Sequence, residues 1–233
     1  MKDEIKVAHV HLETPLVVGD EYVQLLIVEN PSEFYLVVSD LIGQFDGEEG
    51  TFVFSRNGQI MDPAKYGAMI ASPFHFDVND KKILLLLQKK LEGIAFGEKI
   101  VLYNELSAKT MEFLGELAFC VPFSLDYSEP QPMDYLKAAG VKFERSYDSL
   151  EEKIICYLNA LIELKKCEFF VFVNLKSVLS DEKLLQVYAH CQREQVGLLL
   201  IENAKHRPLL SIERAVIITE DLCEILENYK ELC

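Results

Sequence analysis

Four short segments of this chain are apolar almost throughout, and they constrain its fold more than any other feature. In chain order they are LLIV (25–28), FFVFV (169–173), GLLLI (197–201) and AVIIT (215–219). Strands that are apolar on both faces are typical of parallel sheets covered on both sides. Because helical spacing follows most of these segments, the pattern predicts an α/β fold with a parallel sheet.

The segments around these strands indicate the other elements of the head. Apolar positions between Ser32 and Ile42 predict a helix after the first strand, and TFVF (51–54) before Asn57-Gly58 predicts a strand and a hairpin turn. Ser180 is placed to cap a helix that runs through Cys191. A last helix is expected from Asp221 onward.

The middle of the chain has helical spacing and a proline-rich break. The expected helices are Lys81–Glu92 with Asn79 or Asp80 as N-cap, Ile100–Cys120, Met133–Ala139 ending at Gly140, and a helix opened by Ser149 and Glu152 that runs to about Lys166. Prolines between Val121 and Pro132 predict a connector. We therefore expect an α/β head formed by residues 1–60 and 166–233, with a largely helical arm inserted at 61–165.

Charge and composition limit the classes of function. The formal net charge is −15. Only the segment from Asp62 to Ile100 has no excess of acidic residues: residues 61–100 contain six basic and five acidic side chains. Such a chain binds DNA only if its basic residues converge on one face. The longest apolar run, Ile83 to Leu87, is too short to span a membrane. With no cationic leader and six scattered cysteines without a CxxC motif, we expect a soluble, reduced, cytoplasmic protein and no membrane partner.

The stretch LLIVENPSEF (25–34) has the strand, turn and helix outline of a nucleotide-binding junction. A phosphate-binding loop needs glycines, whose backbone donors converge, and a lysine that reaches the phosphates. Neither residue type occurs between Val28 and Phe34, where Glu29 and Glu33 place negative charge and Pro31 removes a backbone donor. The sequence therefore predicts a degenerate P-loop-like topology without nucleotide-binding residues.

Other candidate sites are weak. His9 and His11 are expected on one strand face and could hold a metal, but no third ligand is indicated, and such pairs are usually incidental. Asn174 ends the FFVFV strand, where an active P-loop enzyme would carry an acid for magnesium. No recognised catalytic motif occurs, so we expect no enzyme and no catalytic residues.

The order of several motifs is familiar when they are taken together. FDVN (76–79) leads into an apolar helix, LDYSE (125–129) precedes a short helix ending in AAGVK (138–142), and YDSLEEKI (147–154) is followed by FFVFVN, an SDEKL helix and GLLLIEN. This order, from about Val17 to Asp221, resembles the small CRISPR-associated adaptation proteins of type II-A systems, a Csn-type family. No single motif is specific.

The resemblance implies a function that composition does not. Members of that family have P-loop-type heads with a helical arm and form tetrameric rings. The rings hold double-stranded DNA, preferably at free ends, in a lysine-lined hole, with calcium stabilising the arms. They take part in spacer acquisition with the CRISPR integrase and the RNA-guided effector nuclease, and are not known as nucleases.

The resemblance carries over unevenly to individual residues. The expected DNA contacts are Lys137 and Lys142 first, then Arg56, then Arg145. The expected calcium ligands are Asp126, Glu129 and Asp134, although CVPFSLDYSEP (120–130) has fewer carboxylates than the family run, which predicts weaker binding completed by carbonyls and water. The alternative for each residue is a solvated surface charge.

Three hypotheses remain open at this point. The first is a sequence-independent DNA-end-binding ring of CRISPR adaptation. The second is an acidic protein–protein scaffold of the adaptation complex, in which DNA contact is not essential. The third is a nucleotide-dependent enzyme, for which the outline of LLIVENPSEF is the only support.

Overall fold

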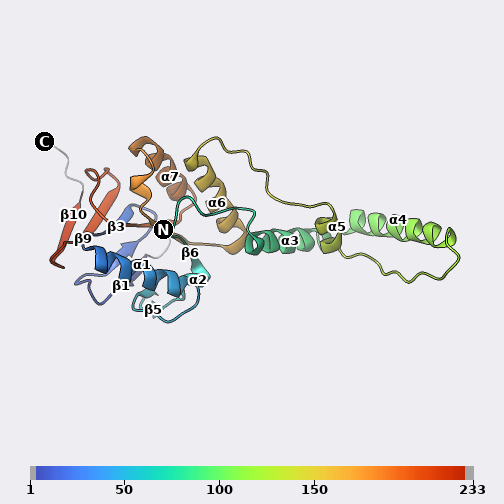
Figure 1. Cartoon of the computed structure of the whole chain (residues 1–233), viewed down its shortest axis with the longest axis horizontal. Coiled ribbons are helices and arrows are strands. Elements are labelled where there is room, and N and C mark those ends of the chain that lie inside the picture. Colours follow the sequence, from blue (N-terminus) through green and yellow to red (C-terminus); the bar gives the residue numbers. More distant parts are fainter. Residues whose placement is uncertain (1–3, 229–233) are drawn as a thin grey trace. The chain divides into compact units, whose positions relative to one another are not determined.

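The chain folds as two compact units in a computed structural model that describes residues 4–228 (Figure 1). The first unit comprises the residues up to Asp77 and those from Ser146 onward, and the second comprises Val78–Arg145. The expected arm boundaries at 61 and 165 lie further out, because β6 (Gly67–Ile70) and α6 (Leu150–Lys165) belong to the first unit. None of the helices between residues 4 and 228 is long and apolar enough to cross a bilayer.

The larger sheet of the first unit has the strand order β10-β9-β3-β8-β7-β6, and the five strands from β9 to β6 are parallel. Besides β6, its strands are β3 (Val23–Val28), β7 (Phe169–Val173), β8 (Gly197–Glu202), β9 (Glu213–Ile218) and β10 (Glu224–Asn228). Every residue of β3, β7 and β8 is buried. The predicted α/β class with a parallel sheet is confirmed.

Both faces of this sheet are covered. Alternate residues such as Leu26, Val171 and Ile201 share one core with α1 (Pro31–Phe45) and with a second, antiparallel sheet of order β2-β1-β4-β5. The strands of the second sheet are β1 (Ile5–Ala8), β2 (Leu16–Val18), β4 (Val53–Arg56) and β5 (Gln59–Ile60). The helices α6 and α7 (Asp181–Arg193) pack together on the other side of the large sheet (Figure 1). Two short elements, α2 (Pro63–Tyr66) and η1 (Leu175–Ser177), complete the unit.

Local sequence signals fix several ends of these elements. Asn57 and Gly58 have φ angles of 50° and 76° between β4 and β5, as the tight hairpin turn requires. Ser149 and Ser180 cap α6 and α7 by accepting hydrogen bonds from backbone amides three residues on. The Glu152 carboxylate accepts from the amide of Asp148, one residue before the cap. The predicted turn and both predicted caps are confirmed.

The helix expected from Asp221 onward is wrong. Thr219 and Cys223 form a turn, Leu222 has a φ of 62°, and β10 pairs antiparallel with β9 from Glu224 opposite Ile218. The free edge of β9 offers backbone partners that local helical spacing does not reveal, so tertiary context overrides propensity here. Residues 229–233, which also fall in the expected helix, lie outside the described residues.

The second unit contains three helices, α3 (Lys81–Phe96), α4 (Ile100–Phe119) and α5 (Pro132–Ala138). Within this unit α4 runs on from α3 instead of folding back along it, and α5 lies at their junction (Figure 1). Side chains of α4 hold the returning connector: Ser107 donates to Glu129 at 2.6 Å, and Tyr103 donates to the Pro130 carbonyl at 3.1 Å. The helices and the connector predicted for this region are confirmed.

The cysteines of the described part form no disulfide. Burial raises the pKa of the Cys167 thiol to about 11 and that of Cys191 to about 12, so both remain protonated and act as small apolar groups. Cys233 lies outside the described residues.

A buried ion pair joins η1 to the start of β9. The Lys176 ammonium donates to both carboxylate oxygens of Glu213 at 2.7 and 2.6 Å, and the same carboxylate accepts from the Tyr188 hydroxyl at 2.8 Å. Lys176 and Glu213 are 5% and 1% exposed. Removing one partner of such a pair leaves a desolvated charge without compensation.

Replacing Lys176 by methionine should therefore lower the free energy of unfolding by about 3–5 kcal/mol. The matched control is Lys205→Met, which removes a lysine from the more exposed pair with Glu227 and should cost less than about 1 kcal/mol. Urea unfolding of both variants and the parent measures the difference. Equal losses for the two variants would contradict this account.

Candidate nucleic-acid interface

Acidic charge is distributed unequally between the two units. The second unit, residues 78–145, has nine basic and ten acidic residues, whereas the rest of the chain has the remaining 14 of 23 basic and 28 of 38 acidic residues. A polyanion is repelled by the first unit as a whole and is not repelled by the second. Any phosphate-binding face is therefore expected on α3, α4, α5 and their connections.

Lys137 and Lys142 are both exposed, and they lie where hydrogen bonds fix the backbone of this unit. Lys137 occupies the last turn of α5, which ends at Ala138 and is followed by Gly140 in a left-handed conformation with a φ of 63°. Just after Lys142, the amide of Phe143 donates to the side chain of Asn79 at 2.8 Å, and that side chain donates back to the Phe143 carbonyl at 3.1 Å. The turn and this clamp hold the backbone that carries both lysines.

Arg56 and Arg145 differ from the two lysines. Arg56 belongs to β4 in the first unit, where it donates to a Glu168 carboxylate oxygen at 2.5 Å and its side chain is only 27% exposed. Its charge is therefore already compensated within the fold. Arg145 is exposed at the end of the second unit. Both residues stay predictions.

Sequence reasoning did not single out the lysines of α3. Lys81, Lys82, Lys89 and Lys90 are all exposed, and Lys82 and Lys89 are seven residues apart, which places them on one face two turns apart. The charge balance of residues 62–100 was the signal that could have identified them. They extend the set of exposed basic residues within the second unit.

The three expected calcium ligands do not converge within the chain. Glu129 accepts from Ser107, Asp134 accepts from the amide of Gln131 at 3.0 Å inside the first turn of α5, and Asp126 is exposed on the connector. Among residues 4–228, the one group of three candidate ligands within 4.8 Å of one another lies elsewhere. These three carboxylates therefore do not lie together within one chain, and calcium, which takes about 6–8 oxygen ligands, stays a prediction that depends on further ligands.

The junction between β3 and α1 is closed to phosphate by its own side chains. The side-chain oxygen of Asn30 accepts from the amides of Ser32 and Glu33 at 3.0 and 3.1 Å, and Pro31 has no amide hydrogen. The donors that a helix N-terminus offers to an anion are therefore occupied or missing. The Glu33 side chain is also buried at this turn, where it adds negative charge.

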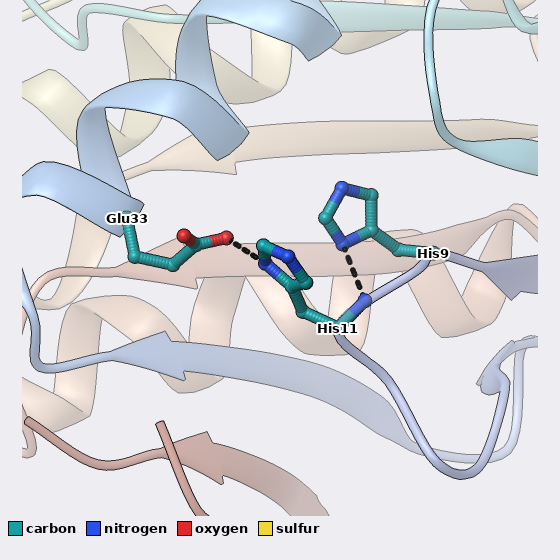
Figure 2. Close-up of side chains that lie close together, drawn as sticks. All are labelled: His9, His11 and Glu33. Atoms are coloured by element: carbon teal, nitrogen blue, oxygen red, sulfur yellow. Dashed lines mark hydrogen bonds and ion pairs between the residues drawn. The ribbon is translucent and has the colours of Figure 1, made fainter. Parts of the chain in front are cut away.

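The two N-terminal histidines are not on a strand face as expected. β1 ends at Ala8, so His9 and His11 lie in the following turn, which is closed by a hydrogen bond from the Leu12 amide to the His9 carbonyl at 3.0 Å. The sequence indicates no third ligand for them, but in the structure Glu33 of α1 lies beside them (Figure 2). Glu33 is 22 residues from His11 in sequence, so no local pattern could reveal this group.

These features define a class: an α/β protein with a parallel sheet, an inserted helical unit and a nucleotide-type turn that lacks free donors. The sequence model of the family described as CRISPR-associated protein (Cas_Csn2) matches residues 44–222. The chain belongs to this family, which confirms the resemblance in the order of its motifs.

Individual relatives agree with this assignment. A CRISPR-associated protein Csn2 of Streptococcus agalactiae is 24% identical over 201 residues, which cover 85% of this chain and 89% of that protein. A CRISPR-associated protein Csn2 of Enterococcus faecalis is 23% identical over 194 residues, which cover 82% and 87%.

A solved structure of a nucleotide-free ATP-binding cassette from an ABC transporter is also similar. It is 12% identical with a TM-score of 0.49, and the match covers 94% of this chain and 88% of that chain. At this TM-score and identity, the similarity supports no conclusion about the fold or activity of the chain.

The closed junction predicts that the chain does not bind ATP. Titration of the protein with fluorescently labelled ATP and magnesium should give no saturable signal up to about 1 mM, the weak end of ordinary binding affinities. An adenylate kinase titrated in parallel provides the positive control. Saturable binding that unlabelled ATP displaces would contradict the prediction.

Proposed function

We propose that the chain is a non-catalytic protein that binds double-stranded DNA without sequence preference, at free ends, and acts in CRISPR spacer acquisition in the cytoplasm. The observation that carries the proposal is the segregation of charge: exposed lysines gather in the nearly neutral second unit, while the first unit is strongly acidic. Membership of a CRISPR-associated family supplies the biological setting.

The proposed contacts are to the DNA backbone. Lys137 and Lys142 are the first candidates, Lys82 and Lys89 extend them along α3, and Arg145 is a further candidate. Arg56 is the weakest, because Glu168 already pairs with it. Lysines that meet phosphates position a duplex without distinguishing its bases, so affinity should depend on salt and not on sequence.

The proposal includes assembly of four copies into a ring. Support comes from α4, a helix of 20 residues, about 30 Å long, that carries large apolar side chains in water. Val101, Leu102 and Phe113 are 66%, 62% and 61% exposed, and Phe119 at its end is 89% exposed. Leu102, Leu106, Phe113 and Leu117 are spaced by four and seven residues, so these exposed side chains form one apolar face of the helix. Such a face marks an interaction site, and a second copy would cover it.

Calcium is the weakest part of the proposal. Because Asp126, Glu129 and Asp134 do not converge within one chain, an ion there needs backbone carbonyls, water or a second copy to complete its oxygen ligands. We expect calcium to bind with a dissociation constant no smaller than about 10⁻⁴ M.

The CRISPR integrase and the RNA-guided effector nuclease are the proposed protein partners. The sheet is proposed to retain a degenerate P-loop-like topology.

A scaffold that contacts only proteins is the second candidate, favoured by the acidic surface of the first unit. It differs from the DNA-binding proposal in one consequence. A scaffold would keep its partners and its role in spacer acquisition when the lysines of the second unit are reversed in charge.

The double variant Lys137→Glu/Lys142→Glu should weaken binding of linear duplex to a similar extent for all sequences. The dependence of log affinity on log salt should become shallower by about 0.9 for each lost phosphate contact. Fluorescence anisotropy with linear DNA over a range of salt concentrations measures both effects. The charge-matched control is Lys6→Glu/Lys65→Glu, which alters exposed lysines of the first unit and should bind as the parent does.

Gel shifts with linear and covalently closed DNA test the end-binding ring itself. The protein should retard the migration of linear duplex and leave the migration of closed circles unchanged, because a circle without ends cannot enter a preformed ring. Equal affinity for both forms would overturn the ring, and an unchanged affinity of the double variant would move the function to the scaffold.

The apolar face of α4 predicts which variants lose the assembly. Phe113→Glu/Leu117→Glu should reduce the mass of the complex, because buried carboxylates would oppose the contact. The control Tyr35→Glu/Ile60→Glu changes apolar residues of the first unit that are more exposed than these two, and it should leave the mass unchanged. Light scattering after size exclusion, with and without calcium, measures the mass. A parent that is monomeric in both conditions would contradict the ring.

A further inference from the structure

Two histidines and one buried glutamate meet where the turn after β1 approaches the first turn of α1. One ligand atom from each of His9, His11 and Glu33 can be chosen so that all three lie within 4.8 Å of one another. Figure 2 shows the Glu33 carboxylate directed at the His11 ring and the His9 ring beside them. The group lies within the first unit and shares no residue with the proposed DNA contacts.

The glutamate of this group is an unusual residue for its position. Glu33 is the third residue of α1 and 6% exposed, and its carboxylate contacts Nδ1 of His11. A buried carboxylate is costly unless a positive charge or a metal compensates it. His11 itself is about half exposed, so its ring can move while Glu33 stays in place.

The second histidine is held beside His11 by its neighbours. The His9 ring stacks on Phe52 with centroids 4.3 Å apart, and its Nδ1 accepts a hydrogen bond from the His11 amide at 3.3 Å. Nδ1 is therefore the His9 nitrogen that faces His11, and an ion bound there would displace this hydrogen bond.

The donor set selects the class of ion. Imidazole nitrogens suit zinc, copper, iron and nickel, whereas calcium and magnesium take oxygen ligands. Two histidines and one glutamate are also a known three-residue zinc set that leaves a fourth position for water. Tetrahedral zinc with bonds of about 2.0–2.2 Å places its ligand atoms roughly 3.3–3.6 Å apart. The His11 and Glu33 atoms, which are now in hydrogen-bond contact, must therefore move apart to admit the ion, and the His9 nitrogen must lie at the same spacing.

We propose that His9, His11 and Glu33 bind one divalent transition-metal ion of the zinc class. The ion links the turn after β1, in the antiparallel sheet, to the start of α1 on the large sheet. It stabilises the same junction at which a nucleotide-binding relative of this fold would hold phosphate. The site is structural, and it is independent of DNA binding.

Zinc binding to the full chain, produced without a histidine tag and freed of metal by a chelator, tests this proposal. Competition with a chromophoric zinc chelator should give one zinc per chain, and zinc should raise the melting temperature. Cobalt in place of zinc should give the visible absorption of a four-coordinate site. The variants His11→Ala and Glu33→Gln should each weaken zinc binding by at least about tenfold.

Matched controls separate this site from other zinc ligands. His75→Ala removes a histidine far from the group in sequence, and Cys120→Ser/Cys223→Ser removes the two cysteines that are exposed among residues 4–228. Both should bind zinc as the parent does. His11→Ala alters a half-exposed side chain, so its far-ultraviolet circular dichroism should match the parent and show that the variant is folded.

Three outcomes would overturn the site. They are the absence of stoichiometric zinc in the parent, unchanged affinity in both His11→Ala and Glu33→Gln, and loss of binding in the cysteine variant alone. Each would leave His11 and Glu33 as an ion pair between two elements. DNA binding by the parent, measured in parallel, should be the same with and without zinc.

Discussion

The rest of the structure depends on one constraint: the parallel strands of the large sheet must be covered on both faces. Because β3, β7 and β8 are buried at every position, helices or a second sheet must exclude water from each side. The core of one side joins α1 to the antiparallel sheet, and α6 and α7 cover the other. The helical insertion leaves this arrangement after β6 and returns before α6, so it can vary without disturbing the core.

This division also separates the chemistry of the chain. The junction between β3 and α1 uses its own side chains, Asn30 and Pro31, where a nucleotide-binding protein would leave backbone donors free. Most of the excess acidic charge lies in the first unit, while the second unit is nearly neutral and carries exposed lysines. Function is therefore expected on the insertion and in assembly of several chains, and not in a cleft at the sheet.

Much of the fold could be predicted from local pattern. The apolar runs identified β3, β7, β8 and β9, and the caps at Ser149 and Ser180 identified the starts of α6 and α7. The strand β10 could not be predicted, because its conformation comes from pairing with β9 and not from its own spacing. Among the site residues, Lys137 and Lys142 are exposed as expected, whereas Arg56 is paired with Glu168, 112 residues away.

The sequence by itself determined the class of fold, the family and the loss of nucleotide-binding residues at the first turn, because each depends on residue types in a local order. Only the tertiary structure decided that the expected calcium ligands remain apart and that Glu33 lies beside His9 and His11. The physical reason is that these groupings depend on how distant segments pack over a shared core. Hydrophobic periodicity fixes which face of an element is buried, but not which polar side chains meet at its ends.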